Sequence, residues 1–170
     1  MKAQVESEAP HEHLWKLIHD MRFGMLTTRH ADGVLHSRPL TTQNRKLDEG
    51  ASLWFFVALS GEPARDVKAD PMVNVSYASP EKDCYVSVSG QARIVDDAER
   101  KKALWSASAK AWFVGGLEDP DLGLLEVRID RAEFWDVKTS KMVQLYKMAK
   151  AAVSGVPPSG MGEHGEVKMR

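Results

Sequence analysis

At 170 residues, with 43% apolar and 28% charged residues, the chain has the length and composition of one globular domain. Its formal net charge of −1 argues against a bulk basic surface for nucleic acid, because such affinity comes from neutralising phosphates with Lys and Arg. The single cysteine, Cys84, cannot form an intramolecular disulfide and fits a reducing compartment. Met1–Pro10 has no apolar run typical of a secretory signal, and the longest apolar run, Leu53–Leu59, is too short to span a bilayer. We therefore expect a cytoplasmic protein with neither a membrane nor a nucleic-acid partner.

The N-terminal part of the chain predicts a helix followed by a β-hairpin. Apolar residues at helical spacing favour a helix over His11–Arg22, and Phe23–Thr28 is typical of a strand. The sequence His30-Ala31-Asp32-Gly33 contains an Asp-Gly turn, a strong hairpin signal. A second strand is expected from Val34 to about Gln43, and a polar turn over Lys46–Gly50.

A buried strand and a short helix come next. The continuous apolar and aromatic run Ala51–Leu59 indicates a strand that is buried on both faces. The helix that follows ends at Asp70, because Pro71 excludes its preceding residue from the α region. Ser60 is the expected N-cap, and Pro63 falls in the first turn.

The rest of the chain predicts four more strands and two more helices. The strands are expected at Met72–Ala78, Tyr85–Val95, Leu122–Ile129 and Glu133–Val137. A helix from Asp96 to about Trp112 opens with the capping-box spacing of Asp96 and Glu99, and a loop follows over Gly115–Asp121. A short helix is expected from Ser140 to about Lys150. We expect residues 1–10 to be a flexible N-terminus, 11–150 a single domain, and 151–170 a disordered tail.

This pattern of six or seven strands in hairpins with flanking helices indicates a mainly β fold. Closure into a small antiparallel barrel removes the exposed strand edges that such a set otherwise leaves. Periodicity does not choose among barrel families.

Arg38 is the first candidate site residue, in the segment His36-Ser37-Arg38-Pro39-Leu40. Strand alternation places His36, Arg38 and Leu40 on one face. A guanidinium among apolar neighbours needs an anion, and its planar fork matches a phosphate or carboxylate. The alternative is a surface arginine that is paired with an aspartate. Pro39 removes a ladder donor, so the strand is expected at an edge or bulged.

Three weaker candidates lie further along the chain. Ser60, Arg65 and Lys68 surround a helix N-terminus that follows a strand, an arrangement that suits a phosphate or a solvated surface helix. Tyr85 ends a polar strand face that could meet a ring system, a partner subunit or water. Trp112 and Phe113 precede a Gly-Gly loop and could cover a flat cofactor, or pack in the core or a dimer interface.

A metal site is not expected. His11, His13 and His19 do not converge on a helix, and H-E-x-x-H spacing is absent from the sequence.

In chain order, seven short segments resemble one family. They are H-S-R-P-L at 36–40, L-W-F-F at 53–56, D-P-M-V-N-V-S-Y at 70–77, Y-V-S-V-S-G at 85–90, W-F-V-G-G at 112–116, D-P-D-L at 119–122 and R-A-E-F-W-D at 131–136. Together they resemble the general stress protein branch of the pyridoxamine 5′-phosphate oxidase-like superfamily, which has the FMN-binding split β-barrel fold.

The resemblance implies a homodimer with FMN held at the subunit interface. It implies that Arg38 contacts the phosphate region of the flavin, that Phe56 and Val57 line the site, and that Tyr85 reaches the flavin where the oxidases usually have Gln. The Arg-Lys pair with which the oxidases bind the phosphate falls here on Glu62 and Pro63, so Arg65 or Lys68 is a candidate substitute.

These arguments together give the expected function and site. We expect an FMN-binding general stress protein, a candidate flavin-dependent oxidoreductase with a nicotinamide electron donor. The alternatives are a pyridoxamine 5′-phosphate oxidase-like enzyme, against which the missing Arg-Lys pair counts, and a non-catalytic flavin sensor or store. The expected cofactor-binding residues are His36, Ser37, Arg38, Pro39, Leu40, Phe55, Phe56, Val57, Ser60, Arg65, Lys68, Tyr85, Trp112 and Phe113. The catalytic residues and the substrate do not follow from the sequence.

Overall fold

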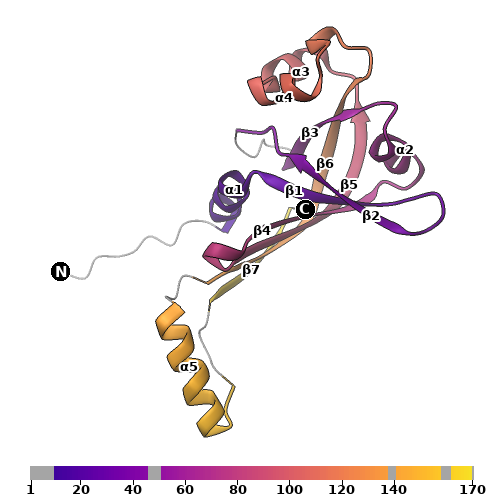
Figure 1. The fold of residues 1–170 in the computed structure, drawn as a ribbon. Coiled ribbons are helices and arrows are strands. Elements are labelled where there is room, and N and C mark those ends of the chain that lie inside the picture. Colours follow the sequence, from indigo (N-terminus) through magenta and orange to yellow (C-terminus); the bar gives the residue numbers. More distant parts are fainter. Residues whose placement is uncertain (1–9, 46–50, 138–140, 158–161, 170) are drawn as a thin grey trace.

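The structure, a computed structural model, describes residues 10–45, 51–137, 141–157 and 162–169 (Figure 1). The helices are α1 (Pro10–Met21), α2 (Glu62–Ala69), α3 (Ala98–Leu104), α4 (Ala107–Trp112) and α5 (Lys141–Ser154), with 3₁₀ turns at Pro80–Lys82 and Gly116–Glu118. The strands are β1 (Phe23–Arg29), β2 (Leu35–Thr41), β3 (Ser52–Ala58), β4 (Met72–Ser79), β5 (Cys84–Val95), β6 (Leu122–Asp136) and β7 (Glu163–Lys168). The expected turn at Lys46–Gly50 and the N-terminus before Pro10 lie outside the described residues.

The strands form one antiparallel sheet in the order β2-β1-β4-β5-β6-β3, with β7 paired to β6. The sheet curls until its two end strands, β2 and β3, contact each other (Figure 1). This arrangement confirms the expected antiparallel split barrel. It also confirms that the strand containing Pro39 lies at an edge of the hydrogen-bonded order, where a missing N–H is tolerated.

The Asp-Gly turn closes the β1–β2 hairpin as expected. Gly33 has φ +84°, a left-handed conformation that glycine adopts without steric cost, and its N–H donates to the carbonyl of His30. The hairpin fixes the register Thr28↔His36 and Leu26↔Arg38. The polar side chains of β2 are therefore held opposite defined residues of β1.

The core lies inside the curled sheet and is closed by α1. Leu14 and Ile18 of α1 are fully buried against residues of β1, β4 and β5. β3 is buried on both faces, as its continuous apolar run predicts. Trp54 and Phe56 of β3 form a second apolar cluster with residues of α3, α4 and the start of β6.

Two expected elements in the second half of the chain are wrong. The strands expected at Leu122–Ile129 and Glu133–Val137 form the single strand β6. Their polar connection is a bulge, because the pairing passes from Ser89↔Arg131 to Gly90↔Ile129 and skips one residue of β6. A Cβ on Gly90 would lie 2.1 Å from the carbonyl oxygen of Arg128, so glycine permits this close approach.

The helix expected from Asp96 to Trp112 is divided into α3 and α4. Trp105 is extended, and the side chain of Ser106 then caps α4 by accepting from the N–H of Ala109. The cap of α3 is Asp97, which accepts from the N–H of Arg100, and not Asp96.

The start of α2 also differs from the prediction. Gly61 is the N-cap, and it makes no side-chain hydrogen bond. The Ser60 hydroxyl instead donates to Asp121. Pro63 in the first turn and the end of the helix at Asp70 are confirmed.

The expected disordered tail is wrong for its last described part. α5 extends to Ser154, and β7 pairs with the second half of β6. The ring of His164 stacks on Trp135 with centroids 5.2 Å apart, and Val167 packs against the core. The polar composition of this segment favours disorder. The segment is nevertheless a strand because it pairs with β6, some 30 residues earlier in the chain, and composition does not reveal such a distant contact. No helix among the described segments is long and apolar enough to cross a lipid bilayer.

Candidate functional site

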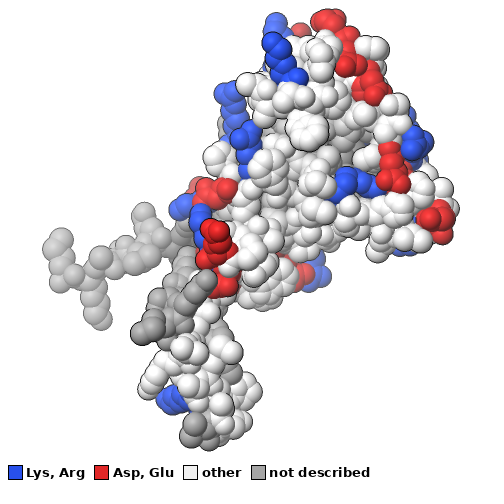
Figure 2. Space-filling model, viewed as in Figure 1, with Lys and Arg blue, Asp and Glu red and all other residues white. Residues whose placement is uncertain are grey.

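A groove of about 380 Å³ opens between β2, β3, the start of α2 and α4. Its walls are mainly apolar and aromatic, and Figure 2 shows few charged side chains over the centre of the face that carries β2. The residues that line this β2–β3 groove are Phe23, Pro39, Leu40, Thr41, Gln43, Phe56, Val57, Ala58, Gly61, Pro63, Ser108, Ala109, Trp112 and Phe113.

Six of the expected cofactor-binding residues meet in this groove. They are Pro39, Leu40, Phe56, Val57, Trp112 and Phe113. β2 and β3 follow each other in the sequence but lie at opposite ends of the hydrogen-bonded strand order, and they thus contribute to one surface together with α4. Trp112 is 81% exposed and is available to a ligand or a partner chain.

The polar side chains of the groove are Thr41, Gln43 and Ser108, which sequence reasoning missed. The Gln43 side chain donates to the carbonyl oxygen of Thr41 at 3.1 Å, and its backbone N–H donates to Trp54 at 2.9 Å. Arg22 donates to the hydroxyl of Ser108 at 3.0 Å. The polar edge of the groove is therefore held by one hydrogen bond within it and by others to Trp54 and Arg22 outside it, a pattern that has no local sequence signal.

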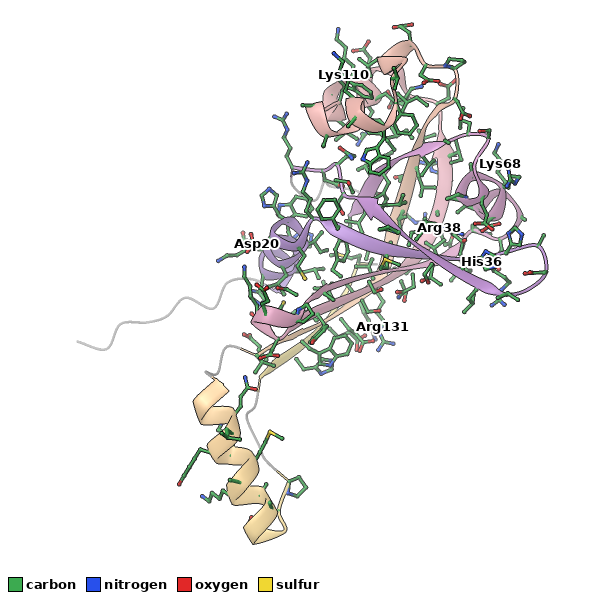
Figure 3. The ribbon with its side chains drawn as sticks, viewed as in Figure 1. Asp20, His36, Arg38, Lys68, Lys110 and Arg131 are labelled. Atoms are coloured by element: carbon green, nitrogen blue, oxygen red, sulfur yellow. The ribbon has the colours of Figure 1, made fainter. Side chains whose placement is uncertain are left out.

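A second group of side chains lies where the β1–β2 hairpin passes α2 (Figure 3). We call it the His–carboxylate cluster. Its members are Thr28, His30, His36, Arg38, Glu62 and Asp66.

Arg38 is paired with carboxylates in this cluster. Its Nη2 lies 3.0 Å from Glu62 Oε2 and 3.5 Å from Asp66 Oδ2, and its Nη1 donates to the hydroxyl of Thr28. The side chain is only 17% exposed. The anion expected for this guanidinium, a phosphate or a carboxylate, is here a pair of protein carboxylates, and only the expected apolar surroundings are wrong. The alternative, a surface arginine paired with an aspartate, holds in part, because Asp66 is one of the two carboxylates but the side chain of Arg38 is mostly buried.

The two histidines of the cluster face the same carboxylates. Nδ1 of His36 lies 2.8 Å from Glu62 Oε1, and Nδ1 of His30 lies 3.2 Å from the same oxygen and 3.0 Å from Asp66 Oδ1. The imidazole rings stack with centroids 4.7 Å apart at 11°. His36 was expected as a flavin contact, and here its ring is directed to α2.

These contacts lower the pKa values of both carboxyl groups. The hydrogen bond from His36 lowers the pKa of Glu62 most, and Arg38 adds to it. Burial alone raises the pKa of Asp66, but hydrogen bonds from Thr28 and His30 and the charge of Arg38 outweigh it, so that the net direction is downward. Both groups are thus held as carboxylates. Glu62 and Asp66 are four residues apart on one face of α2, a spacing visible in the sequence, but their partners could not be found locally.

The other expected site residues lie outside the groove. Phe55 is fully buried in the core, and Ser37 shares a hydrogen bond with Thr27. Arg65 donates to the carbonyl of Ser60, next to Gly61 in the groove lining. Lys68 lies in the last turn of α2, on its outer side (Figure 3). Tyr85 lies on β5 opposite Trp135, in a different part of the sheet.

Several known proteins are similar to this chain in sequence and fold. The family model described as "Pyridoxamine 5'-phosphate oxidase like" matches residues 9–159. Protein bli-3 of Neurospora crassa is 29% identical over 146 residues, which cover 80% of this chain and 69% of the relative. General stress protein 26 of Bacillus subtilis is 30% identical over 98 residues, which cover 56% of this chain and 66% of the relative.

Among solved structures, the general stress FMN/FAD binding protein of Xanthomonas citri superposes with a TM-score of 0.65 and 29% identity. The match covers 76% of this chain and 90% of that one. The resemblance drawn from the seven sequence segments is confirmed by these matches. The chain, with its curled antiparallel sheet and its groove between β2 and β3, belongs to the pyridoxamine 5′-phosphate oxidase-like family.

Proposed function

We propose that this chain is a general stress flavoprotein that binds FMN in the β2–β3 groove. The observation that carries the proposal is the aromatic lining of the groove beside three polar side chains, the composition that suits a flat ring system with one polar edge. The groove volume of about 380 Å³ falls within the range of roughly 300–1,000 Å³ that is typical of ligand pockets. The likeness to the Xanthomonas citri protein supports the same ligand class.

The residues of the groove divide between holding a ring and orienting it. Phe56, Trp112 and Phe113 offer aromatic faces, while Thr41 and Gln43 offer hydrogen-bonding groups to the polar edge of an isoalloxazine. A bound flavin would supply electron-transfer chemistry, and the protein would supply position and electrostatics. Among the described residues that line the groove, none has an ionisable side chain, so the groove itself offers no general acid or base.

For the flavin phosphate we propose Arg65 in place of the family's Arg-Lys pair. Arg38 is already shared between two carboxylates, which would repel a phosphate. Lys68 lies in the last turn of α2, away from the groove. Arg65 lies in the first turn, close to Gly61 and Pro63, which line the groove. The backbone of Gly61 carries no side chain that could obstruct this approach.

We further propose that two copies of the chain form a homodimer that covers the groove. Phe23 is 64% exposed, Trp112 81% and Val114 90%, and large apolar groups exposed together usually mark an interface. The flavin would then lie between the subunits. The cytoplasmic location and the nicotinamide electron donor stay predictions.

Flavin titration of the purified protein tests the proposal. We expect bound FMN to show a shifted visible spectrum and quenched fluorescence. Trp112→Ala should weaken binding several-fold, because an aromatic contact contributes about 0.5–1.5 kcal/mol beyond its buried area. Trp135→Ala is the matched control, since Trp135 is also partly exposed but lies outside the groove. Unchanged flavin spectra on titration, or equal losses in the two variants, would contradict the proposed site.

Turnover assays distinguish this proposal from two further functions. Rapid reduction of the bound flavin by NADH or NADPH indicates an oxidoreductase, and a flavin that is not reduced indicates a sensor or store. Oxidation of a pyridoxamine-like amine would indicate the oxidase activity, against which the absent Arg-Lys pair counts.

A further inference from the structure

The His–carboxylate cluster brings donors of two chemical types to one point. One nitrogen of His30, one nitrogen of His36 and one carboxylate oxygen of Glu62 all lie within 4.8 Å of one another. All three side chains are partly exposed, so that an ion can reach them from solvent. We propose that these three residues bind a first-row divalent transition-metal ion, for which Zn²⁺ is the appropriate probe.

The donors are carried by rigid elements. His36 lies within β2, in register with Thr28 of β1, and His30 directly follows β1, where its backbone N–H donates to Val34. Glu62 is the first residue of α2. The turn of the hairpin brings the two imidazoles into a parallel stack, and both Nδ1 atoms face Glu62 Oε1.

The donor set selects the class of ion. Two imidazole nitrogens with one carboxylate are a ligand set that zinc and other first-row metals accept, and it leaves a coordination position for water or another ligand. Mg²⁺ and Ca²⁺ prefer oxygen donors alone, so this set disfavours them. Asp66 Oδ1, which is 3.0 Å from Nδ1 of His30, is a fourth donor within reach.

The other groups of the cluster orient the donor oxygens. Arg38 binds Glu62 through Oε2, which leaves Oε1 directed to the histidines. In the same way, Thr28 donates to Oδ2 of Asp66 at 2.6 Å and leaves Oδ1 directed to His30. Partners behind the ligands are the usual means by which proteins fix ligand orientation.

The charge of the cluster favours a cation. The two carboxylates and the one guanidinium of the cluster together contribute a net charge of −1. Hydrogen bonds between the histidines and the two carboxylates, with no ion bound, are the competing interpretation. The two interpretations differ in what they predict for added metal.

The proposed metal site is separate from the proposed flavin site. None of its three ligands lines the β2–β3 groove. Metal binding can therefore be measured on protein without flavin, and failure of either proposal leaves the other standing.

The experiment is a Zn²⁺ titration of untagged full-length protein that has been stripped with EDTA and dialysed free of chelator. The protein competes for the metal with a chromophoric Zn²⁺ indicator. We expect one Zn²⁺ per chain, and no competition from Mg²⁺ at the same concentration. His36→Ala and Glu62→Gln should each weaken binding by at least about tenfold, because even substitutions behind a metal ligand cost roughly 10–100-fold in affinity.

His164→Ala is the matched control. His164 also lies beside a carboxylate, with Nε2 3.6 Å from Glu133 Oε2, but within the described chain it belongs to no group of three donors. Its substitution should leave Zn²⁺ affinity unchanged. Co²⁺ gives a second readout, since its visible absorption bands should appear with the wild-type protein and disappear with His36→Ala.

Three outcomes overturn the proposal. They are the absence of Zn²⁺ uptake at micromolar concentration, uptake that is lost in the His164→Ala control to the same degree, and wild-type affinity in Glu62→Gln. Circular dichroism shows whether each variant is folded. If His36→Ala does not fold, Glu62→Gln decides, because it keeps the size of the side chain and alters only the donor.

Discussion

The β2–β3 groove and the His–carboxylate cluster share the same strand and helix but differ in chemistry. Along β2, Arg38 belongs to the cluster and Pro39 to the groove, and at the start of α2 Gly61 belongs to the groove and Glu62 to the cluster. The groove side chains are mainly apolar and in part well exposed, whereas the cluster side chains form hydrogen bonds and ion pairs with one another. Substitutions in the groove should therefore act on ligand affinity, and those in the cluster on stability first.

The largest effect is expected from Asp66→Ala. Asp66 is 3% exposed and accepts hydrogen bonds from Thr28 and His30 beside Arg38, so its removal leaves a mostly buried guanidinium with fewer partners. We expect a loss of about 3 kcal/mol in the free energy of unfolding in urea, the cost typical of breaking a buried ion pair.

The comparison variant is Phe23→Ala in the groove, where the side chain is 64% exposed. Because Phe23 lies in the proposed subunit interface, the comparison uses the unfolding free energy of the single chain, which should stay within about 0.5 kcal/mol of wild type. If both variants unfold at the same urea concentration, the contrast between the two regions is wrong.

A smaller effect is expected on flavin affinity, from Arg65→Ala. A hydrogen bond to a charged group contributes about 1.5–3 kcal/mol, so its loss should weaken the FMN complex roughly ten- to hundredfold. Riboflavin lacks the phosphate and should bind wild type and variant alike. Fluorescence titrations of both ligands measure the difference.

Arg38→Ala and Lys68→Ala are the controls for that experiment. A larger FMN-specific loss of affinity in Arg38→Ala would show that Arg38 binds the phosphate, as the family resemblance indicates. Wild-type FMN affinity in all three variants would show that the flavin phosphate does not bind on this side of the groove.

The smallest effect is expected at Cys84 of β5, which belongs to neither region. Its rate of alkylation shows whether a substitution in either region opens the structure. Burial, with a contribution from Asp136, raises the pKa of the Cys84 thiol to about 11. At pH 8 only roughly one molecule in a thousand then carries the reactive thiolate, so alkylation of the native protein should be very slow. Mass spectrometry of iodoacetamide-treated samples should show faster modification in Asp66→Ala and an unchanged rate in Trp112→Ala. Rapid modification of the wild type would contradict the burial.

Local signals in the sequence predicted much of the fold. The Asp-Gly turn located the β1–β2 hairpin, the continuous apolar run located β3, and Pro71 located the end of α2. The errors occurred where a distant contact decides. The polar segment after Ile129 could be a turn or a bulge, and only its pairing with Gly90 makes it a bulge.

The same difference between local signals and distant contacts applies to the candidate site. Six groove residues could be found because large apolar side chains and family segments mark them. The cluster could not be found, since Glu62 and His36 are 26 residues apart and each is an ordinary polar residue in its own element. The carboxylates that pair with Arg38 could not be predicted for the same reason, because both belong to α2.

The pairing of β7 with β6 has a consequence for solubility. β7 covers the backbone of Arg131–Asp136, which would otherwise present unpaired N–H and C=O groups next to Phe134 and Trp135. Unpaired edges of this kind are templates for association with other chains. β7 itself carries Glu163, Glu166 and Lys168, charged residues that discourage such addition at the new edge. Proteolytic loss of these last residues should therefore produce aggregation before it produces unfolding.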